Sequence, residues 1–242
     1  MKNFLIALQF LTTFPVKIKK IKEGELPGSV TWYPLVGLVI GLFLAGLWLC
    51  LKNIFPVPVS ALLLVGFYLL LTGALHLDGF VDTVDGLYGG RTKEDIFRIM
   101  EGSTIGAKGA VWLVLLIALK VVLLTVLLSR GAFLLLILFP VLGRYAITIL
   151  MKYSVYPKKT GLGRAYCGKI TNSGFLVINL LTFVIAWYFH LKGFAAFLAV
   201  ILLVLIIKDY FGKKIGGVTG DVFGFTIETA EATVLLLFVA GY

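Results

Sequence analysis

Apolar runs long enough for membrane helices recur along the chain, and short polar loops separate them. A helix needs about 20 apolar residues to cross the ~30 Å hydrocarbon core of a bilayer. The sixth apolar run, residues 194–207, is shorter than this, so it requires snorkelling lysines or a thinner bilayer. The expected fold class is an all-α polytopic helical membrane bundle, with residues 1–242 as a single domain. The predicted spans are 30–51, 59–75, 109–128, 132–151, 175–191, 194–207 and 225–241.

The first fifteen residues form a further apolar stretch, which ends at Pro15 and lacks a small-residue cleavage site. We therefore expect an interfacial helix there rather than a removed signal peptide. Composition agrees with a membrane protein, because 60% of the 242 residues are hydrophobic and only 14% are charged. In a soluble domain about 25% of residues are charged.

Lysine and arginine gather in alternate loops, and the formal net charge is +10. Such clusters mark the cytoplasmic side of a membrane protein. The intervening loops offer only Lys52, Arg130 and Lys192. With seven spans, this alternation predicts a cytoplasmic N-terminus and an outer C-terminus. It also explains the basic charge without a nucleic-acid partner.

Three aspartates follow the second apolar run. Asp78, Asp82 and Asp85 are spaced i, i+4, i+7, so a helix would place them on one face. Carboxylates so placed repel one another unless a cation lies among them, and hard oxygen ligands suit Mg²⁺ or Mn²⁺. The plainer interpretation is a solvated acidic loop with capping aspartates. Apolar residues between the aspartates favour a half-buried helix end instead, where carboxylates need a partner.

His76 stands just before this triplet. It has the chemistry of an acid or base, a metal ligand, or a group that orients a ligand. A hydrogen bond to a carbonyl at the helix end is an equally good interpretation.

A glycine-rich loop at residues 213–224 is predicted on the same side of the membrane. Glycines let backbone N–H groups approach an anion closely, and a following helix N-terminus favours negative charge. Asp221 lies inside this loop, and Lys213 and Lys214 begin it. Together with the aspartate triplet, the loop suggests a metal site beside a phosphate cradle.

Two basic residues fall inside predicted spans rather than in loops. Ionisable groups at such depth are costly and usually face a polar cavity. Arg144 could reach anionic substrate oxygens or the aspartates, and Lys120 could do the same or neutralise a carboxylate. The basic loop at 156–164 also faces inward, where the positive-inside pattern accounts for any single lysine.

The segment from His76 to Gly86 resembles the signature of the cobalamin synthase family, also called adenosylcobinamide-GDP ribazoletransferases. The resemblance covers nearly the full length and keeps the family's order, which makes it more specific than any one motif. The further similar segments are 33–37, 161–163, 168–170 and 216–221 with Glu228.

The chain departs from the family's pattern in two places. Where the family often reads Asp-Ser-Arg, residues 101–104 are Glu-Gly-Ser-Thr, so the role of this turn is in doubt, although Glu101 could replace the acid. Lys158 stands near a position where the family tends to have arginine. Lysine keeps the charge but lacks the bidentate fork.

The resemblance implies a transferase that uses Mg²⁺ or Mn²⁺ at the cytoplasmic face of a prokaryotic plasma (inner) membrane. The ribose hydroxyl of α-ribazole, or of its 5′-phosphate, would displace GMP from adenosylcobinamide-GDP and form adenosylcobalamin or its 5′-phosphate. Catalysis of such a step rests mostly on positioning and electrostatics. Membrane lipid is a further expected partner, and a homo-oligomer is left open.

The resemblance also implies roles for individual residues. We expect His76, Asp82 and Asp85 to be catalytic, with one aspartate taking the proton of the attacking hydroxyl. Asp78, Asp82, Asp85 and Asp221 are expected to hold the metal. The expected substrate-binding residues are Arg144, Lys158, Lys169, Gly217, Thr219, Gly220 and Glu228.

Two other classes of protein are weighed against this interpretation. A CDP-alcohol phosphotransferase of phospholipid synthesis also uses spaced aspartates and Mg²⁺, but here Arg91 has the wrong spacing and a second aspartate pair is missing. A membrane transporter would suit Lys120 and Arg144. However, the acidic residues gather at one face instead of following a midplane pathway.

Overall fold

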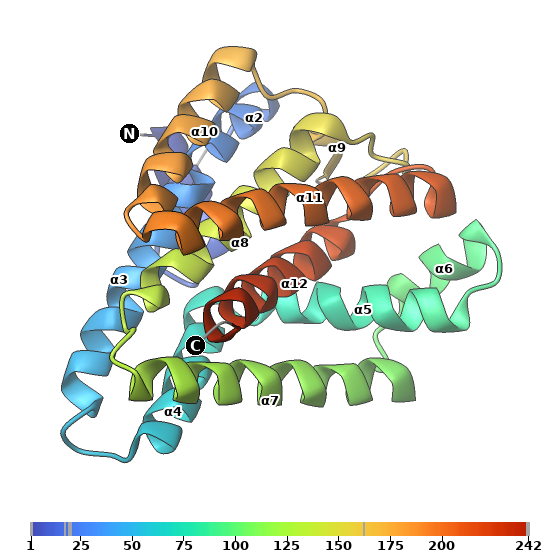
Figure 1. Cartoon of the computed structure of the whole chain (residues 1–242). Coiled ribbons are helices and arrows are strands. Elements are labelled where there is room, and N and C mark those ends of the chain that lie inside the picture. The colour runs from blue at the N-terminus through green and yellow to red at the C-terminus, as the bar shows by residue number, and fades with distance from the viewer. Residues whose placement is uncertain (1, 17, 19–20, 162, 241–242) are drawn as a thin grey trace.

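The computed structural model describes residues 2–16, 18, 21–161 and 163–240. Within these residues the chain is helical and contains no strand (Figure 1). The all-α fold class is thereby confirmed. The elements are α1 (Lys2–Leu11), η1 (Glu23–Glu25), α2 (Leu26–Ser29), η2 (Val30–Trp32), α3 (Tyr33–Leu51), α4 (Val57–Thr72), α5 (Leu75–Gly89), α6 (Lys93–Met100), α7 (Ala107–Ser129), α8 (Leu135–Tyr153), α9 (Gly163–Tyr166), α10 (Asn172–Trp187), α11 (His190–Ile215) and α12 (Gly220–Val239).

Five helical stretches of the described chain are long and apolar enough to cross a membrane: the continuous stretch Leu26–Leu51, α7, α8, α11 and α12. The α4–α5 pair passes the same test only when taken together, and the two helices are bent by 91°. The number of spans is therefore five or six, near the predicted seven. α10 is apolar but has only 16 residues. The end of the last predicted span, at residue 241, lies outside the described residues.

The sixth predicted span is longer than the sequence pattern suggested. The expected range was 194–207, whereas α11 has 26 residues and continues to Ile215. Its polar extension contains an i,i+4 ion pair between Asp209 and Lys213, with 2.7 Å between Oδ2 and Nζ. Such pairs stabilise an exposed helical face. This span therefore needs no thinner bilayer.

The second predicted span, 59–75, is interrupted in the structure. α4 ends at Thr72, and both Gly73 (φ 61°) and Ala74 (φ 53°) adopt the left-handed conformation before α5 begins. Glycine tolerates this conformation at little cost. The backbone N–H of Thr13 donates to the Leu71 carbonyl at 2.8 Å, which satisfies one of the carbonyls left free where α4 ends. The bend separates the acidic helix α5 from the apolar helix α4.

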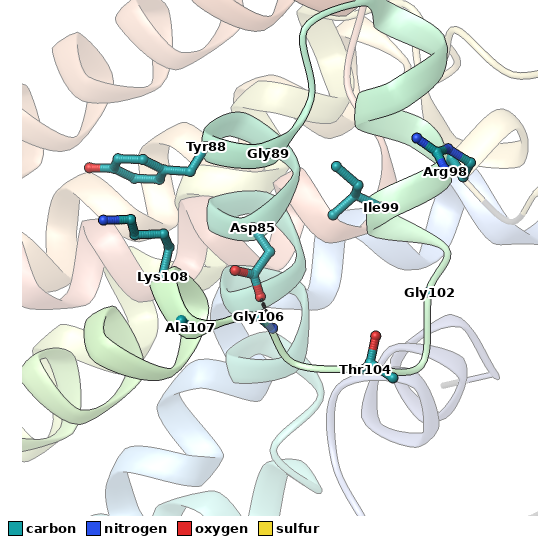
Figure 2. Close-up of a pocket in the computed structure, with 10 residues that line it drawn as sticks. All are labelled: Asp85, Tyr88, Gly89, Arg98, Ile99, Gly102, Thr104, Gly106, Ala107 and Lys108. Carbon is teal, nitrogen blue, oxygen red and sulfur yellow. Dashed lines mark hydrogen bonds between the residues drawn. The ribbon is translucent and has the colours of Figure 1, made fainter.

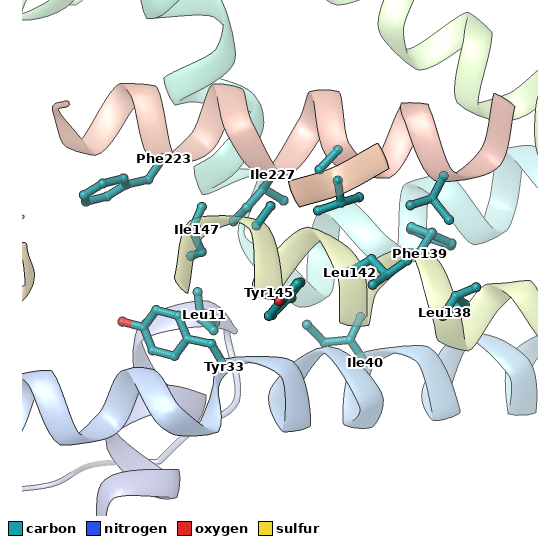
Figure 3. Packing of buried hydrophobic residues seen from close by; sticks show 14 of the residues in the cluster. Leu11, Tyr33, Ile40, Leu138, Phe139, Leu142, Tyr145, Ile147, Phe223 and Ile227 are labelled. Atoms are coloured by element: carbon teal, nitrogen blue, oxygen red, sulfur yellow. The ribbon is translucent and has the colours of Figure 1, made fainter. Parts of the chain in front are cut away.

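α3 and α8 pack with their backbones in close approach. A Cβ on Gly37 would lie 2.5 Å from the Pro140 carbonyl oxygen, and one on Gly41 would lie 2.5 Å from the Ile137 Cα. Small residues let membrane helices approach in this way. Figure 3 shows the apolar side chains of α8, Tyr145 among them, lying between α3 and α12. α8 is thus the central helix of the core.

α5 packs against α12 and α7 (Figure 1). A Cβ on Gly79 would lie 2.9 Å from the Asp221 carbonyl oxygen, and one on Gly224 would lie 2.5 Å from the His76 carbonyl oxygen. The first turns of α5 and α12 therefore meet backbone to backbone. This contact places the residues of the acidic motif next to the glycine-rich loop.

Candidate active site

The three aspartates of α5 lie on one continuous helix, as their spacing predicts, and Asp221 approaches them from the start of α12. α5 is not among the five helices that span by themselves. Burial, together with the negative charges of Asp78, Asp221 and Asp85, raises the pKa of Asp82 to about 7. The other three carboxylates are therefore close enough to repel Asp82 when it is charged.

Asp78 and Asp221 line one cavity of about 190 Å³ together with His76, Gly220 and Tyr166. Five elements form its walls: α1, α5, α8, α9 and the first two turns of α12. Tyr166 belongs to α9 and contributes an aromatic wall opposite the carboxylates. The aspartate motif and the glycine-rich loop, which the sequence analysis placed only on the same side of the membrane, line one cavity in the structure.

A divalent cation suits the donor atoms of this cavity, because every acidic ligand offers oxygen. In the described part of the chain, no three His, Cys, Asp or Glu side chains form a group that could hold a metal ion. Mg²⁺, however, is usually bound by one or two protein carboxylates, with substrate phosphates and water as further ligands. The residues present fit that pattern, and the Mg²⁺ site stays a prediction.

Asp85 is engaged in a different way from its two neighbours on α5. Its Oδ2 accepts from the Gly106 N–H at 2.7 Å and its Oδ1 from the Gly109 N–H at 2.8 Å, and Figure 2 shows the carboxylate beside Gly106. These N–H groups belong to the beginning of α7, which has no cap from its own N-cap residue. Asp85 therefore caps α7 and ties it to α5.

The glycine-rich loop brings Asp221 into place through two features. Gly216 (φ 80°) and Gly217 (φ 151°) both take positive φ values as the chain leaves α11. Thr219 then caps α12, because its Oγ1 accepts from the Val222 N–H at 3.4 Å. The same hydroxyl donates to Asp221 Oδ2 at 3.1 Å, which leaves the other carboxylate oxygen available to the cavity.

His76 is only 5% exposed, and its Nε2 has no hydrogen-bond partner in the described structure. Burial lowers its pKa well below the usual range, and the nearby positive charges of Arg144 and Lys120 lower it further. The imidazole is therefore neutral at physiological pH. It faces the aspartate cavity as a hydrogen-bonding group rather than as a cation.

Behind the cavity lies a buried ion network that joins α4, α7, α8 and α12. Lys120 Nζ lies 2.6 Å from Glu228 Oε2 and 2.7 Å from Glu231 Oε2. Arg144 Nη1 bonds to Glu231 and, at 2.7 Å, to the Tyr68 hydroxyl. The two cations balance the two carboxylates, which is the condition for burying charge in a membrane bundle.

This network bears on two predicted substrate-binding residues. Arg144 is completely buried and Glu228 is 1% exposed. Arg144 is bonded to Glu231 and Tyr68, and Glu228 is bonded to Lys120. Their contact with substrate stays a prediction. Lys120 neutralises carboxylates, which is one of the two roles weighed for it.

Three further predicted residues, Lys158, Gly217 and Lys169, are not among those that line this cavity. Lys158 forms an ion pair with Glu101 at 2.8 Å between Nζ and Oε1. A Cβ on Gly217 would overlap the Val155 carbonyl, so this glycine is required by close packing. Lys169 lies at a separate, basic cavity. Roles in substrate binding for these residues stay predictions.

Sequence reasoning missed Glu231 and Tyr68. Glu231 follows Glu228 by three residues in an otherwise apolar helix, and two acids so placed match the two buried bases Lys120 and Arg144. This match in charge was the sequence signal that could have identified Glu231. Tyr68 carries no comparable pattern, because its partners Arg144 and Glu231 are distant in the sequence.

The fold and site define a polytopic membrane protein with an acidic cavity beside a glycine-rich loop. Residues 3–239 match the family model described as "Cobalamin-5-phosphate synthase". The chain therefore belongs to the cobalamin-5-phosphate synthase family.

Relatives of similar length support this assignment. The chain is 36% identical over 236 residues to the adenosylcobinamide-GDP ribazoletransferase of Alkaliphilus metalliredigens, covering 98% of this chain and 94% of that relative. It is 35% identical over 246 residues to the protein of the same name from Acinetobacter baumannii, covering 100% and 98%. The corresponding protein of Thermodesulfovibrio yellowstonii is 34% identical over 250 residues, covering 99% and 96%. No solved structure matches the chain.

Proposed function

We propose that this chain joins adenosylcobinamide-GDP to α-ribazole or its 5′-phosphate and releases GMP, in a Mg²⁺-dependent reaction at the cytoplasmic face of the membrane. Family membership and relatives named adenosylcobinamide-GDP ribazoletransferase support the activity. The observation that carries the proposal is the convergence of Asp78 and Asp221 on one cavity, with Asp82 one helical turn away.

The reaction replaces one phosphoester bond by another. The ribose hydroxyl oxygen attacks the phosphorus on the cobinamide side of the diphosphate, the bond to the GMP oxygen breaks, and GMP leaves with the electron pair. The hydroxyl proton passes to a base. Asp82 is the best matched carboxylate for this role, because a base whose pKa is about 7 is efficient near neutral pH.

Asp78 and Asp221 would hold Mg²⁺, which neutralises the charge of the diphosphate when bound. Thr219 orients Asp221 by donating to its Oδ2 at 3.1 Å. The buried walls of the cavity, including Tyr166, exclude water that would otherwise compete with the ribose hydroxyl. Asp85 would have a structural role, because its hydrogen bonds hold the start of α7 against α5.

The cytoplasmic placement rests on charge. Lys93 lies beside Gly216 of the glycine-rich loop, Lys108 lines a cavity with Asp85, and the charge of Lys158 acts on Asp221. The loops predicted on the opposite side offer only Lys52, Arg130 and Lys192. The acidic cavity thus lies on the lysine-rich side of the protein, which is the side expected to face the cytoplasm.

The test is an assay of the purified protein in liposomes with adenosylcobinamide-GDP and either acceptor. GMP and the joined corrinoid should appear in equal amounts, stop appearing after treatment with EDTA, and return on addition of Mg²⁺. Product formation that continues unchanged with EDTA would contradict the metal role, whereas absence of product with both acceptors would contradict the transferase activity itself.

A further inference from the structure

A second cavity, of about 710 Å³, lies beside α9 and is lined by basic residues. Lys159, Arg164 and Lys169 contribute three positive charges, Thr160 adds a hydroxyl, and no carboxylate lines the cavity in the described part of the chain. A concave surface with cations, a hydroxyl donor and no acid has the chemistry of an anion site.

Among the described residues, the cations of this cavity have no acidic partner, in contrast to two other surface lysines, Lys158 and Lys213. Lys158 and Lys213 are neutralised by Glu101 and Asp209. Lys159 and Lys169 form no ion pair in the described structure. Arg164 Nη1 donates to the Lys159 carbonyl at 2.8 Å, which orders the loop without reducing its charge. The positive charge is therefore available to a ligand.

α9 is the wall shared by the two cavities. Gly163 and Tyr166 line the aspartate cavity, whereas Arg164 and Ala165 line the basic cavity. A ligand in the basic cavity is thus separated from the aspartates by a single helical turn. The two cavities are therefore neighbours on either side of α9.

Tyr156 is a second connection between the basic cavity and the aspartate cavity. A Cβ on Gly161, which lines the basic cavity, or on Gly163 would overlap the Tyr156 ring or hydroxyl. Burial raises the pKa of Tyr156, and the negative charge of Asp221 is the next contribution. Tyr156 therefore packs on the glycines of the basic loop and also lies within electrostatic reach of the aspartate site.

We propose that the basic cavity binds the phosphate monoester of the acceptor, the 5′-phosphate of α-ribazole, while the ribose hydroxyl reaches the aspartate cavity across α9. This inference rests on the proposed function. A monoester dianion is satisfied by lysine, arginine and hydroxyl donors alone, whereas the diphosphate of the other substrate matches the carboxylate site that suits a divalent cation. The proposal thus gives each phosphate group a site of its own.

The test compares the two acceptors in liposomes of phosphatidylcholine, using the double variant Lys159→Gln with Lys169→Gln. The ratio of KM for the phosphorylated acceptor to KM for α-ribazole should rise about tenfold or more, the equivalent of losing about 1.4 kcal/mol of phosphate binding. Lys52→Gln, which removes an exposed charge from a loop predicted on the opposite side, is the control and should leave the ratio unchanged. An unchanged ratio in the double variant overturns the proposal.

A phospholipid headgroup offers the same phosphate chemistry, so a second arm adds phosphatidylglycerol to the liposomes. If the double variant weakens both acceptors equally and only in anionic vesicles, the cavity is a lipid site and the proposal fails. Thermal stabilisation by α-ribazole 5′-phosphate gives a readout independent of turnover. Stabilisation of the unaltered protein that is lost in the double variant supports the phosphate site even if no GMP release is seen, and equal stabilisation of both contradicts it.

Discussion

Gly79 of α5 and Gly224 of α12 face each other where the two helices cross, and a Cβ on Gly224 would lie 3.1 Å from the Gly79 Cα. No larger residue fits at this crossing without separating the helices. The contact sets the distance between the aspartates of α5 and Asp221. The chemistry of the site therefore depends on two residues that have no functional group.

Gly224→Ala should reduce turnover strongly while the protein remains in the membrane. The new methyl group would lie 2.5 Å from the His76 carbonyl oxygen, so α12 must move away from α5. Overpacking of this kind costs about 1–3 kcal/mol of stability. Gly66→Ala on α4 is the matched control, because nothing lies within 4 Å of a Cβ there. Equal activity of the two variants would show that the crossing does not position the site.

Asp82→Asn should raise the thermal stability of the metal-free protein at alkaline pH. A carboxyl group whose pKa is raised on folding, from 3.8 to about 7, stabilises the fold fully below the lower value, and this stability is lost as pH rises through the upper one. Asparagine removes the repulsion, and after allowance for solvent screening the gain is on the order of 1 kcal/mol, or about 2–4 °C.

The measurement is the unfolding temperature with EDTA present, at about pH 8 and about pH 4, the two sides of the transition. The difference between the variant and the unaltered protein should be largest at the higher pH. A stability gain that is the same at both pH values would mean that charge repulsion is not its cause.

Asp85→Asn should act mainly on stability. Asparagine retains one acceptor oxygen but places an N–H₂ group against a backbone donor, so the Gly106 and Gly109 N–H groups cannot both be satisfied. Loss of such a bond costs about 1–3 kcal/mol. Thermal unfolding of the solubilised protein checks this. Unchanged stability combined with complete loss of turnover would instead support the sequence prediction that Asp85 is catalytic.

Glu231→Gln should destabilise the protein severely, because it leaves Lys120 and Arg144 buried with Glu228 as their one remaining carboxylate in the network. Removing one partner of a buried ion pair lowers the stability of the fold by about 3–5 kcal/mol. Adding Lys120→Met to this variant restores charge balance and should recover part of the loss. If the two substitutions together are simply additive in unfolding experiments, the network is not electrostatically coupled.

The sequence was sufficient to predict what depends on local spacing. The i, i+4, i+7 pattern placed Asp78, Asp82 and Asp85 on one helix, and apolar length predicted a multi-pass bundle. For the aspartates of α5 and Asp221, the sequence predicted only that they share one side of the membrane. The contact between Gly79 and Gly224 that brings them together joins residues far apart in the chain.

What the sequence could not predict are the contacts made over long separations. The break at Ala74 depends on a left-handed non-glycine residue next to Thr13 of the N-terminal segment. The partners of Arg144 are Glu231 and Tyr68, on two other helices. The capping role of Asp85 requires the backbone of Gly106, which carries no side-chain signal.

The most direct test of the account is GMP release from adenosylcobinamide-GDP by Asp82→Asn in liposomes at saturating Mg²⁺. We expect turnover to fall by at least about a hundredfold, the usual contribution of a positioned base. Asp209→Asn, an exposed aspartate on α11 paired with Lys213, should keep normal turnover as the control. Near-normal GMP release by the Asp82 variant would contradict the assignment of the reaction to the aspartate site.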